Sequence, residues 1–186
     1  LEEVYCGTGV SGKIYCCDWD GVTPDFILLG KPLAAGYSAL SAVVTSSQIE
    51  QCIRDGQGRL QHSTTHQALS TGVAAALAVQ TIVHRDGFLE RVNNLSSLIQ
   101  STLRRELGQI DEVRSIHGRG LRLTIEHNTE DNMAFATRLK NAMLERHQMI
   151  IDSKWHRVCI NPPLITSEAQ VSEFLEAFIK EYREAL

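Results

Sequence analysis

The pattern of hydrophobic and polar positions divides the chain into two parts of different character. In the first third, short β-branched or aromatic runs alternate with glycine-rich turns, which predicts strands at residues 13–17, 26–29 and 41–45. The chain also starts in a strand-like run at residues 1–4. We therefore expect it to begin inside a folding unit and to be part of a longer polypeptide.

Helical periodicity dominates from Gln67 onward. An alanine-rich stretch to His84 and an amphipathic stretch to about Leu107 predict two long helices, which Gly87 separates. The remaining predicted elements are strands at 121–126, 149–151 and 157–160, a helix at 131–147, and a last helix opening after Thr166-Ser167-Glu168. The C-terminal half is therefore expected to be α+β.

Composition and charge narrow the class of protein. With 186 residues, 43% of them hydrophobic and 22% charged, the chain can bury a core, and a net charge of -4 gives no general attraction for nucleic acid or anionic lipid. We find no apolar run of membrane-spanning length and no secretory signal. The five cysteines form no small-scaffold spacing, which favours reduced thiols. These features predict a soluble, cytoplasmic protein that acts on a small molecule.

Two motifs suggest nucleotide or metal binding and fail on their context. Gly7-x-Gly9-x-x-Gly12 matches a nucleotide-binding turn, but that mechanism needs a helix N-terminus directly after the glycines, and residues 13–17 predict a strand. His62 and His66 have the spacing of two ligands on one helical face, but no third ligand accompanies them. We therefore expect neither a nucleotide site nor a metal site.

Lys31 is the strongest candidate for a catalytic residue. It follows an apolar strand and lies between Gly30 and Pro32, so its amine should project from a rigid strand end. A lysine amine attacks a carbonyl when it is neutral, and burial or neighbouring cations favour that state. Taken alone, a lysine is far more commonly a solvated surface residue, so the context must supply the assignment.

An ordered series of motifs around Lys31 gives the chain a family resemblance. The series consists of Glu2-Glu3-Val4, Gly7 to Lys13, Gly21-Val22-Thr23-Pro24-Asp25, and Gly30-Lys31-Pro32-Leu33-Ala34-Ala35-Gly36-Tyr37. In this order, over essentially the whole chain, it resembles the class III aminotransferases, which are pyridoxal-phosphate (PLP) enzymes of fold type I. The resemblance implies an α/β fold: residues 1–86 form the remainder of the PLP-binding large domain, and residues 87–186 form a small C-terminal α+β domain.

The resemblance also assigns residues to a cofactor site. Lys31 matches the lysine that forms a Schiff base with PLP, and Glu2 matches the acid, usually Asp, that binds the pyridine nitrogen. Glu3 and Val4 match packing residues of the family, and Val4 is expected to contact the cofactor. Thr65 matches a threonine that binds the phosphate of the neighbouring subunit, which implies a homodimer with a shared active site. The alternative is that the hydroxyls of Ser63-Thr64-Thr65 cap a helix.

The chain departs from the family in two places. Many members have an arginine that binds the substrate carboxylate three residues before a Pro-Pro pair, where this chain has Cys159. Arg157 could substitute, or it could be a surface arginine. The family's phosphate-binding loop and its ring-stacking aromatic residue, which precede the acidic strand, have no counterpart here.

The resemblance therefore predicts a PLP-dependent aminotransferase that moves an amino group from an amine or amino acid to an oxo acid. The donor and acceptor are not identified by the sequence. Other PLP activities of the family, such as an aminomutase or a decarboxylase, would use the same lysine. A catalytically silent fragment that acts as an interaction module is the alternative outside enzymology.

Overall fold

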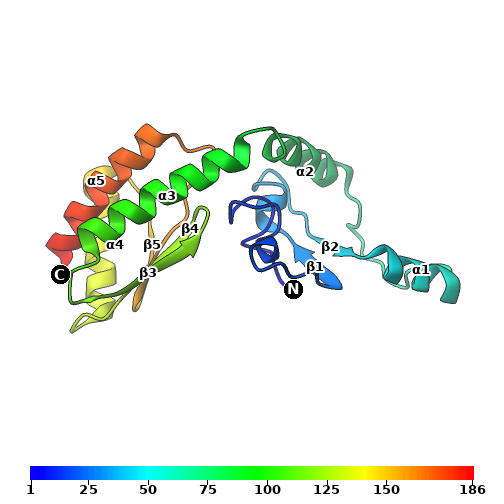
Figure 1. The fold of residues 1–186 in the computed structure, drawn as a ribbon, viewed down its shortest axis with the longest axis horizontal. Coiled ribbons are helices and arrows are strands. Elements are labelled where there is room, and N and C mark those ends of the chain that lie inside the picture. Colours follow the sequence, from blue (N-terminus) through cyan, green and yellow to red (C-terminus); the bar gives the residue numbers. More distant parts are fainter. The chain divides into compact units, whose positions relative to one another are not determined.

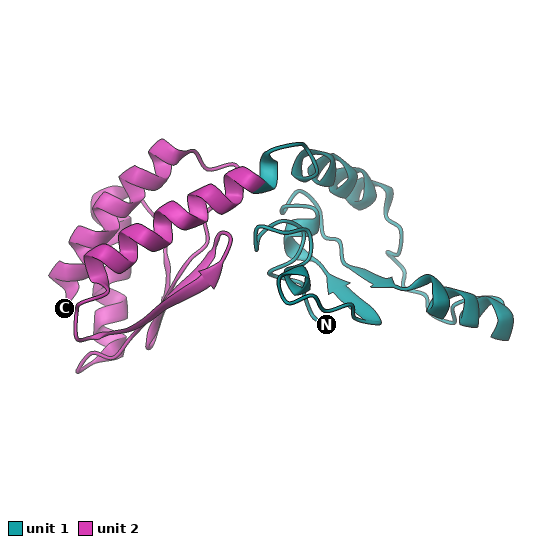
Figure 2. Cartoon of the chain, in the orientation of Figure 1, with its two compact units in different colours: residues 1–89 teal, residues 90–186 magenta.

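A computed structural model describes residues 1–186. The chain divides into an N-terminal unit, Leu1–Leu89, and a C-terminal unit, Glu90–Leu186 (Figure 2). The sequence predicted a boundary between residues 86 and 87. None of the helices combines the length and the apolar character needed to cross a membrane.

The N-terminal unit is built around a small antiparallel pair of strands, β1 (Phe26–Leu29) and β2 (Ala42–Thr45) (Figure 1). The predicted strands at 26–29 and 41–45 are therefore confirmed. Ile27 and Leu29 point to a small apolar cluster with Cys17, while Phe26 and Leu28 on the opposite face are exposed. Two strands alone bury too little surface for independent stability, so the other segments of this unit must contribute.

The predicted strand at 13–17 is wrong. These residues form bends that lead into a short 3-10 helix, η1 (Cys16–Trp19). The carboxylate of Glu3 accepts hydrogen bonds from the backbone N–H groups of Cys16 and Cys17, at 2.7 and 2.8 Å. These amides are therefore not available to a sheet ladder, and a tertiary contact overrides the strand-like composition.

Two helices complete the N-terminal unit. Helix α1 (Ser47–Gly56), which the sequence pattern did not predict as a separate element, begins at the N-cap Ser46 and buries none of its side chains. Helix α2 (Ser70–Val83) confirms the alanine-rich helix and begins three residues after the predicted start at residue 67. It is apolar on nearly every side, yet Val73 and Leu77 are exposed. A helix of this composition is normally buried all round.

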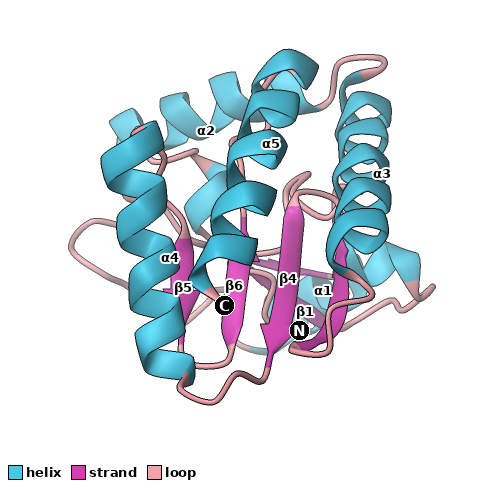
Figure 3. Ribbon diagram, turned by 90° about the vertical axis from the view of Figure 1, so that its left-hand side faces the viewer, coloured by secondary structure: helices cyan, strands magenta, loops and turns pink.

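The C-terminal unit has three helices on one side of a four-stranded antiparallel sheet (Figure 3). The strand order is β3-β4-β6-β5. The strands are β3 (Val113–Arg119), β4 (Arg122–His127), β5 (Asp152–Lys154) and β6 (Arg157–Ile160), and the helices are α3 (Phe88–Leu107), α4 (Asn132–His147) and α5 (Glu168–Ala185). The unit is thus the α+β structure that the sequence predicted.

The helix starts in this unit follow capping rules. Asp131 accepts from the N–H groups of Met133 and Ala134, both at 3.0 Å, which begins α4. Ser167 and Gln170 form a reciprocal capping box at the start of α5. Because each cap satisfies amides that no carbonyl in the helix can reach, the predicted starts at residues 131 and 166–168 are confirmed.

Buried aromatic and aliphatic side chains form the core between the helices and the sheet. Phe135 is fully buried and has edge contacts with His127 and Tyr182, with ring centroids 4.6 and 5.1 Å apart. The apolar stripe of α5 completes this core: Val171, Leu175, Phe178, Ile179 and Tyr182. Glu181, also buried, accepts from Arg146 and from His147, and the hydrogen bond with His147 is the main reason its pKa is lowered.

Two elements of the C-terminal unit differ from the sequence prediction. The strand expected at 149–151 is wrong: the N–H of Met149 bonds to the carbonyl of Met143 and closes the end of α4, so β5 begins only at Asp152. Strand β3 was missed, because its glycine and polar residues resemble a turn. At Gly118 of β3, a Cβ atom would lie 2.1 Å from the carbonyl oxygen of Arg122, so only glycine allows β3 and β4 to pair here.

Candidate active site

Lys31 lies immediately after the carboxyl end of β1. The strand ends at Leu29, Gly30 continues in an extended conformation, and Lys31 begins a short 3-10 helix, η2 (Lys31–Leu33). The φ angle of Lys31 is +30°, in a region that a residue with a side chain rarely adopts. Such a conformation costs about 1–3 kcal/mol and persists where the surroundings impose it, frequently at functional sites. The predicted position of Lys31 at a strand exit is confirmed.

The N-terminal segment runs parallel to β1 and reaches the same end of it. Leu28 donates to the carbonyl of Leu1, and Glu3 donates to the carbonyl of Leu28, both at 2.9 Å. The segment then passes so close to Gly30 that a Cβ atom there would lie 3.1 Å from Cγ1 of Val4. Because neighbouring parallel segments end at a common edge, residues 2–5 are brought beside the residues that carry Lys31.

Tyr5 is the residue of this segment that reaches Lys31. The Nζ atom of Lys31 lies 5.6 Å from the centroid of the Tyr5 ring. This distance is within the range of a cation–π contact. Sequence reasoning did not select Tyr5, because only the parallel arrangement with β1 brings the two residues together.

Glu2 is exposed, and its carboxylate forms a hydrogen bond within its own segment. Its Oε1 atom accepts a hydrogen bond from the N–H of Val4 at 2.8 Å. The side chain thus closes the turn that follows it. A carboxylate at this edge of the unit is the hydrogen-bond acceptor that a protonated pyridine nitrogen requires, and the amine of Lys31 is the group that binds an aldehyde. The residues at this strand end therefore fit the aldehyde and ring-nitrogen parts of PLP.

The glycine-rich turn after Tyr5 folds over the buried carboxylate of Glu3. Gly7 lies so close that a Cβ atom there would be 3.0 Å from both the carbonyl oxygen and Oε2 of Glu3. Burial, together with the Glu3 carboxylate, raises the pKa of the Cys17 thiol to about 11. Burial also raises the pKa of Cys6 to about 11. Both thiols are therefore protonated at neutral pH. Glu3, regarded from the sequence as a packing residue, is the polar anchor of this turn.

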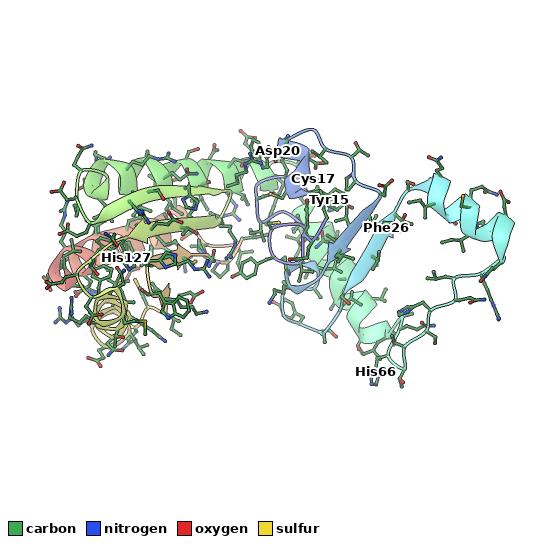
Figure 4. The ribbon with its side chains drawn as sticks, turned by 90° about the horizontal axis from the view of Figure 1, so that it is seen from below. Tyr15, Cys17, Asp20, Phe26, His66 and His127 are labelled. Atoms are coloured by element: carbon green, nitrogen blue, oxygen red, sulfur yellow. The ribbon has the colours of Figure 1, made fainter.

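Thr65 is exposed in the loop that precedes α2. The N-cap position of α2 belongs to Leu69, and no side chain caps that helix. The alternative that the hydroxyls of residues 63–65 cap the helix is therefore wrong. His66 lies in the same loop, away from Tyr15 and Cys17 (Figure 4), and His62 is also outside any helix. Phosphate binding by Thr65 stays a prediction.

Arg157 and Cys159 lie on β6 of the C-terminal unit and differ in burial. Cys159 is buried, contacts Thr124 with a sulfur–oxygen distance of 3.9 Å, and lines a pocket of about 440 Å³. Residues 149–151, the Pro162-Pro163 pair and Phe174 form other parts of the same pocket. Arg157 is exposed and does not line it. Substrate binding by Arg157 stays a prediction.

Comparison with known proteins identifies the family. The sequence profile of the family described as "Aminotransferase class-III" matches residues 1–181. The chain belongs to the class-III aminotransferase family. The curated ornithine aminotransferase of Staphylococcus carnosus is 30% identical over 184 residues, which cover 96% of this chain and 42% of that relative.

Solved structures of class-III aminotransferases share the fold. The acetylornithine aminotransferase of Elizabethkingia anophelis is 26% identical, with a TM-score of 0.86 over 98% of this chain and 44% of that chain. A Toxoplasma gondii ornithine aminotransferase, described with partial occupancy of PLP at its active site, is 24% identical, with a TM-score of 0.86 over 99% of this chain and 42% of that chain. The expected fold type I architecture is therefore confirmed. The chain spans less than half the length of these relatives.

Proposed function

We propose that this chain carries the lysine-bearing part of a PLP-dependent aminotransferase, which transfers an amino group from an amine or amino acid to an oxo acid. The observation that carries the proposal is the position of Lys31, with a positive φ angle at the carboxyl end of β1 and beside the segment from Glu2 to Tyr5. Membership of the class-III aminotransferase family supports the same chemistry.

Lys31 has two tasks in this proposal. Its neutral amine would hold the cofactor covalently through Nζ, and the same amine, when free, would move a proton at the substrate carbon. When bound, PLP supplies an electron-withdrawing ring that stabilises negative charge at that carbon. Because the backbone of Lys31 is fixed at the start of η2, directly after Gly30 and the end of β1, the amine starts from one defined point for both tasks.

The other proposed residues hold the cofactor. Glu2 would accept a hydrogen bond from the protonated pyridine nitrogen, and this would compete with its present bond to the N–H of Val4. Val4 would pack at the cofactor ring from its position against Gly30. Thr65 of a second copy would donate its hydroxyl to the phosphate.

The first experiment measures covalent attachment. PLP is added to the purified chain, the product is fixed with borohydride, and the labelled peptide is located by mass spectrometry. We expect a visible absorption band and a pyridoxyl group on Lys31, both lost in Lys31→Ala. Lys13→Ala is the matched control, because Lys13 belongs to the same unit and its Nζ donates to the carbonyl of Asp18. Absence of label on Lys31 in the unmodified chain would overturn the proposal.

The second experiment measures the reaction. The amino donor is varied against pyruvate and 2-oxoglutarate as acceptors, and transfer of the amino group is followed. Transfer to either acceptor supports an aminotransferase. If label is fixed on Lys31 but no acceptor is aminated, while donors lose CO2 or rearrange, the decarboxylase or aminomutase alternative replaces it.

We also propose a homodimer. Helix α2 supports this, because it is apolar on nearly every side and still exposes Val73 and Leu77. We expect sedimentation analysis to give twice the mass of one chain, and we expect Leu77→Glu to shift the distribution to the monomer. Leu60→Glu is the control, since Leu60 is exposed to a similar extent outside this helix. A monomer at all concentrations would contradict the proposal.

A further inference from the structure

Two of the five cysteines meet on either side of the glycine-rich turn of the N-terminal unit, and the proposed function uses neither. All five are free thiols in this structure. Cys6 and Cys16 are partly exposed, and a hydrogen bond joins their side chains. We propose that this pair is a modification site, at which a small-molecule disulfide such as glutathione disulfide oxidises the two thiols to an intramolecular disulfide. The inference goes beyond the proposed function and does not depend on it.

The backbone brings these two positions together at one carboxylate oxygen. Oε2 of Glu3 accepts a hydrogen bond from the N–H of Cys16 at 2.7 Å. The same atom lies so near Gly7, the residue after Cys6, that a Cβ atom there would be 3.0 Å away. The turn between them closes on itself, because the N–H of Ser11 donates to the carbonyl of Cys6 at 3.2 Å. Two cysteines can be bridged only where the backbone already holds them close, and here both segments contact the same carboxylate.

Cys17 is the competing partner for Cys6, and its surroundings disfavour that bond. Its side chain is buried in the small apolar cluster of this unit, and its thiol is hydrogen-bonded with the Glu3 carboxylate. A disulfide with Cys6 would withdraw the sulfur from both contacts. A bond between Cys16 and Cys17 is disfavoured as well, because neighbouring Cα atoms are about 3.8 Å apart, closer than the roughly 4.4–6.8 Å of most disulfides. The pair Cys6 and Cys16 needs neither change.

The reaction consists of two thiol–disulfide exchanges and needs no further reagent. The thiolate of one cysteine attacks a sulfur of glutathione disulfide, the S–S bond breaks, and one glutathione leaves as its thiolate. The thiolate of the second cysteine then attacks the protein sulfur of this mixed disulfide and expels the second glutathione. The two protons lost by Cys6 and Cys16 end on the two glutathione thiols. The protein pair is thus oxidised by two electrons, and glutathione disulfide is reduced by two.

The environment of the pair makes the exchange slow and its product persistent. Burial, together with the negative charges of Cys16 and Glu3, raises the pKa of Cys6 to about 11. Its thiolate, which is the attacking form, is therefore scarce at pH 7. Pairs whose thiolates are stabilised form easily reduced disulfides, and this environment has the opposite effect. The disulfide, once formed, should therefore resist reduction.

The first test identifies the bond. The reduced full chain is treated with glutathione disulfide at mildly alkaline pH, quenched with acid, alkylated, digested with trypsin and analysed by mass spectrometry. Cleavage after Lys13 separates Cys6 from Cys16, so the bond joins two peptides. We expect a Cys6–Cys16 link that is lost in Cys16→Ser and retained in Cys17→Ser. Cys52, which is exposed, is the internal control and should form the mixed disulfide with glutathione instead.

The same reaction in concentrated urea shows whether the fold selects the pair. In the unfolded chain Cys6 should link to Cys16 and Cys17 in nearly equal amounts, because the two loops have nearly equal length. The folded chain should favour Cys16 by about tenfold or more, since the Cys17 thiol would lose a hydrogen bond to a charged group. Equal proportions in the folded chain, or mixed disulfides alone, would overturn the proposal.

The second test measures the effect of the bond on the unit. It closes a loop of 11 residues, from Cys6 to Cys16. The lost freedom of the unfolded chain should lower the unfolded-to-folded ratio of the N-terminal unit by about 100-fold. Urea unfolding followed by Trp19 fluorescence in Trp155→Phe gives this ratio before and after oxidation, and dithiothreitol should reverse the change. Cys6→Ser, treated alike, should show no change. An oxidised chain no more stable than the reduced one would mean that the bond distorts the turn, and this result would also overturn the proposal.

Discussion

The two units of this chain differ in the contacts that stabilise each of them internally. The C-terminal unit has a continuous apolar core, in which Phe135, Phe178 and Tyr182 are fully buried. The N-terminal unit buries few apolar side chains and is organised by polar contacts to its backbone, chiefly the Glu3 carboxylate with the amides of Cys16 and Cys17. It also carries the strained Lys31. The candidate chemistry thus lies where apolar packing is weakest and backbone geometry is most constrained.

The difference between the units can be measured because each contains one of the two tryptophans. Trp19 belongs to the N-terminal unit and Trp155 to the C-terminal unit. Variants with Trp155→Phe or Trp19→Phe therefore give a fluorescence signal from one unit at a time. Urea unfolding followed by each signal reports the free energy of unfolding of that unit.

The largest effect is expected from truncating the core of the C-terminal unit. Phe135→Ala should lower the free energy of unfolding reported by Trp155 by about 3–5 kcal/mol, because a fully buried ring is replaced by a cavity. Ile27→Ala is the comparison in the N-terminal unit, and we expect it to lower the value reported by Trp19 by about 2 kcal/mol, because Ile27 belongs to a much smaller cluster. Equal losses in the two units would contradict the contrast between them.

A smaller effect is expected from removing the polar anchor of the N-terminal unit. Glu3→Ala leaves two backbone amides without their charged acceptor and should lower the free energy of unfolding reported by Trp19 by about 2–3 kcal/mol. Glu2→Ala is the matched control, because Glu2 is exposed and should change the same value by about 0.5 kcal/mol or less. If both variants behave alike, Glu3 does not organise the turn.

The smallest effect is a dependence of the C-terminal unit on pH. Burial lowers the pKa of His127 below its ordinary value of 6.5. Below pH 6.5 the unfolded chain therefore binds a proton that the folded chain resists, and the stability reported by Trp155 should decline with falling pH, by at most about 1.4 kcal/mol per pH unit. The decline should stop once the pH has passed the lowered pKa of the folded state.

His127→Gln separates this effect from other titrations. The amide of glutamine can donate to the carbonyl of Trp155, as Nε2 of His127 does at 2.8 Å, but it does not titrate. We expect the slope between pH 6.5 and 5 to flatten in this variant. The bonds of Glu181 are lost only at lower pH, because its pKa lies below its ordinary value of 4.5. An unchanged slope would assign the pH dependence to another group.

The sequence predicted best where local physics alone decides the structure. The helices at residues 131–147 and after Ser167 were found from apolar periodicity and capping residues, which act within a few positions of each other. Strands at 26–29 and 157–160 were found from their short apolar runs. Each of these elements contains its own signal.

The secondary-structure predictions were wrong where a residue far away in the sequence determines the local structure. The segment at 13–17 has a strand-like composition, but the amides of Cys16 and Cys17 are bound by Glu3, more than ten residues away. Strand β3 has no clear alternation, and it exists because β4 supplies its hydrogen bonds and Gly118 allows the close approach. The residue pattern within one segment contains no information about hydrogen-bond partners elsewhere in the chain.

By itself, the sequence determined the family and the fold class, because an ordered series of motifs can be recognised without coordinates. The role of Lys31 stays a prediction from the same motifs. Only the tertiary structure decided what surrounds that lysine. The parallel approach of residues 1–4 to β1 brings Tyr5 beside Lys31 and ties the Glu2 carboxylate to its own turn. These contacts depend on backbone hydrogen bonds between residues far apart in the chain, which a motif contains only implicitly.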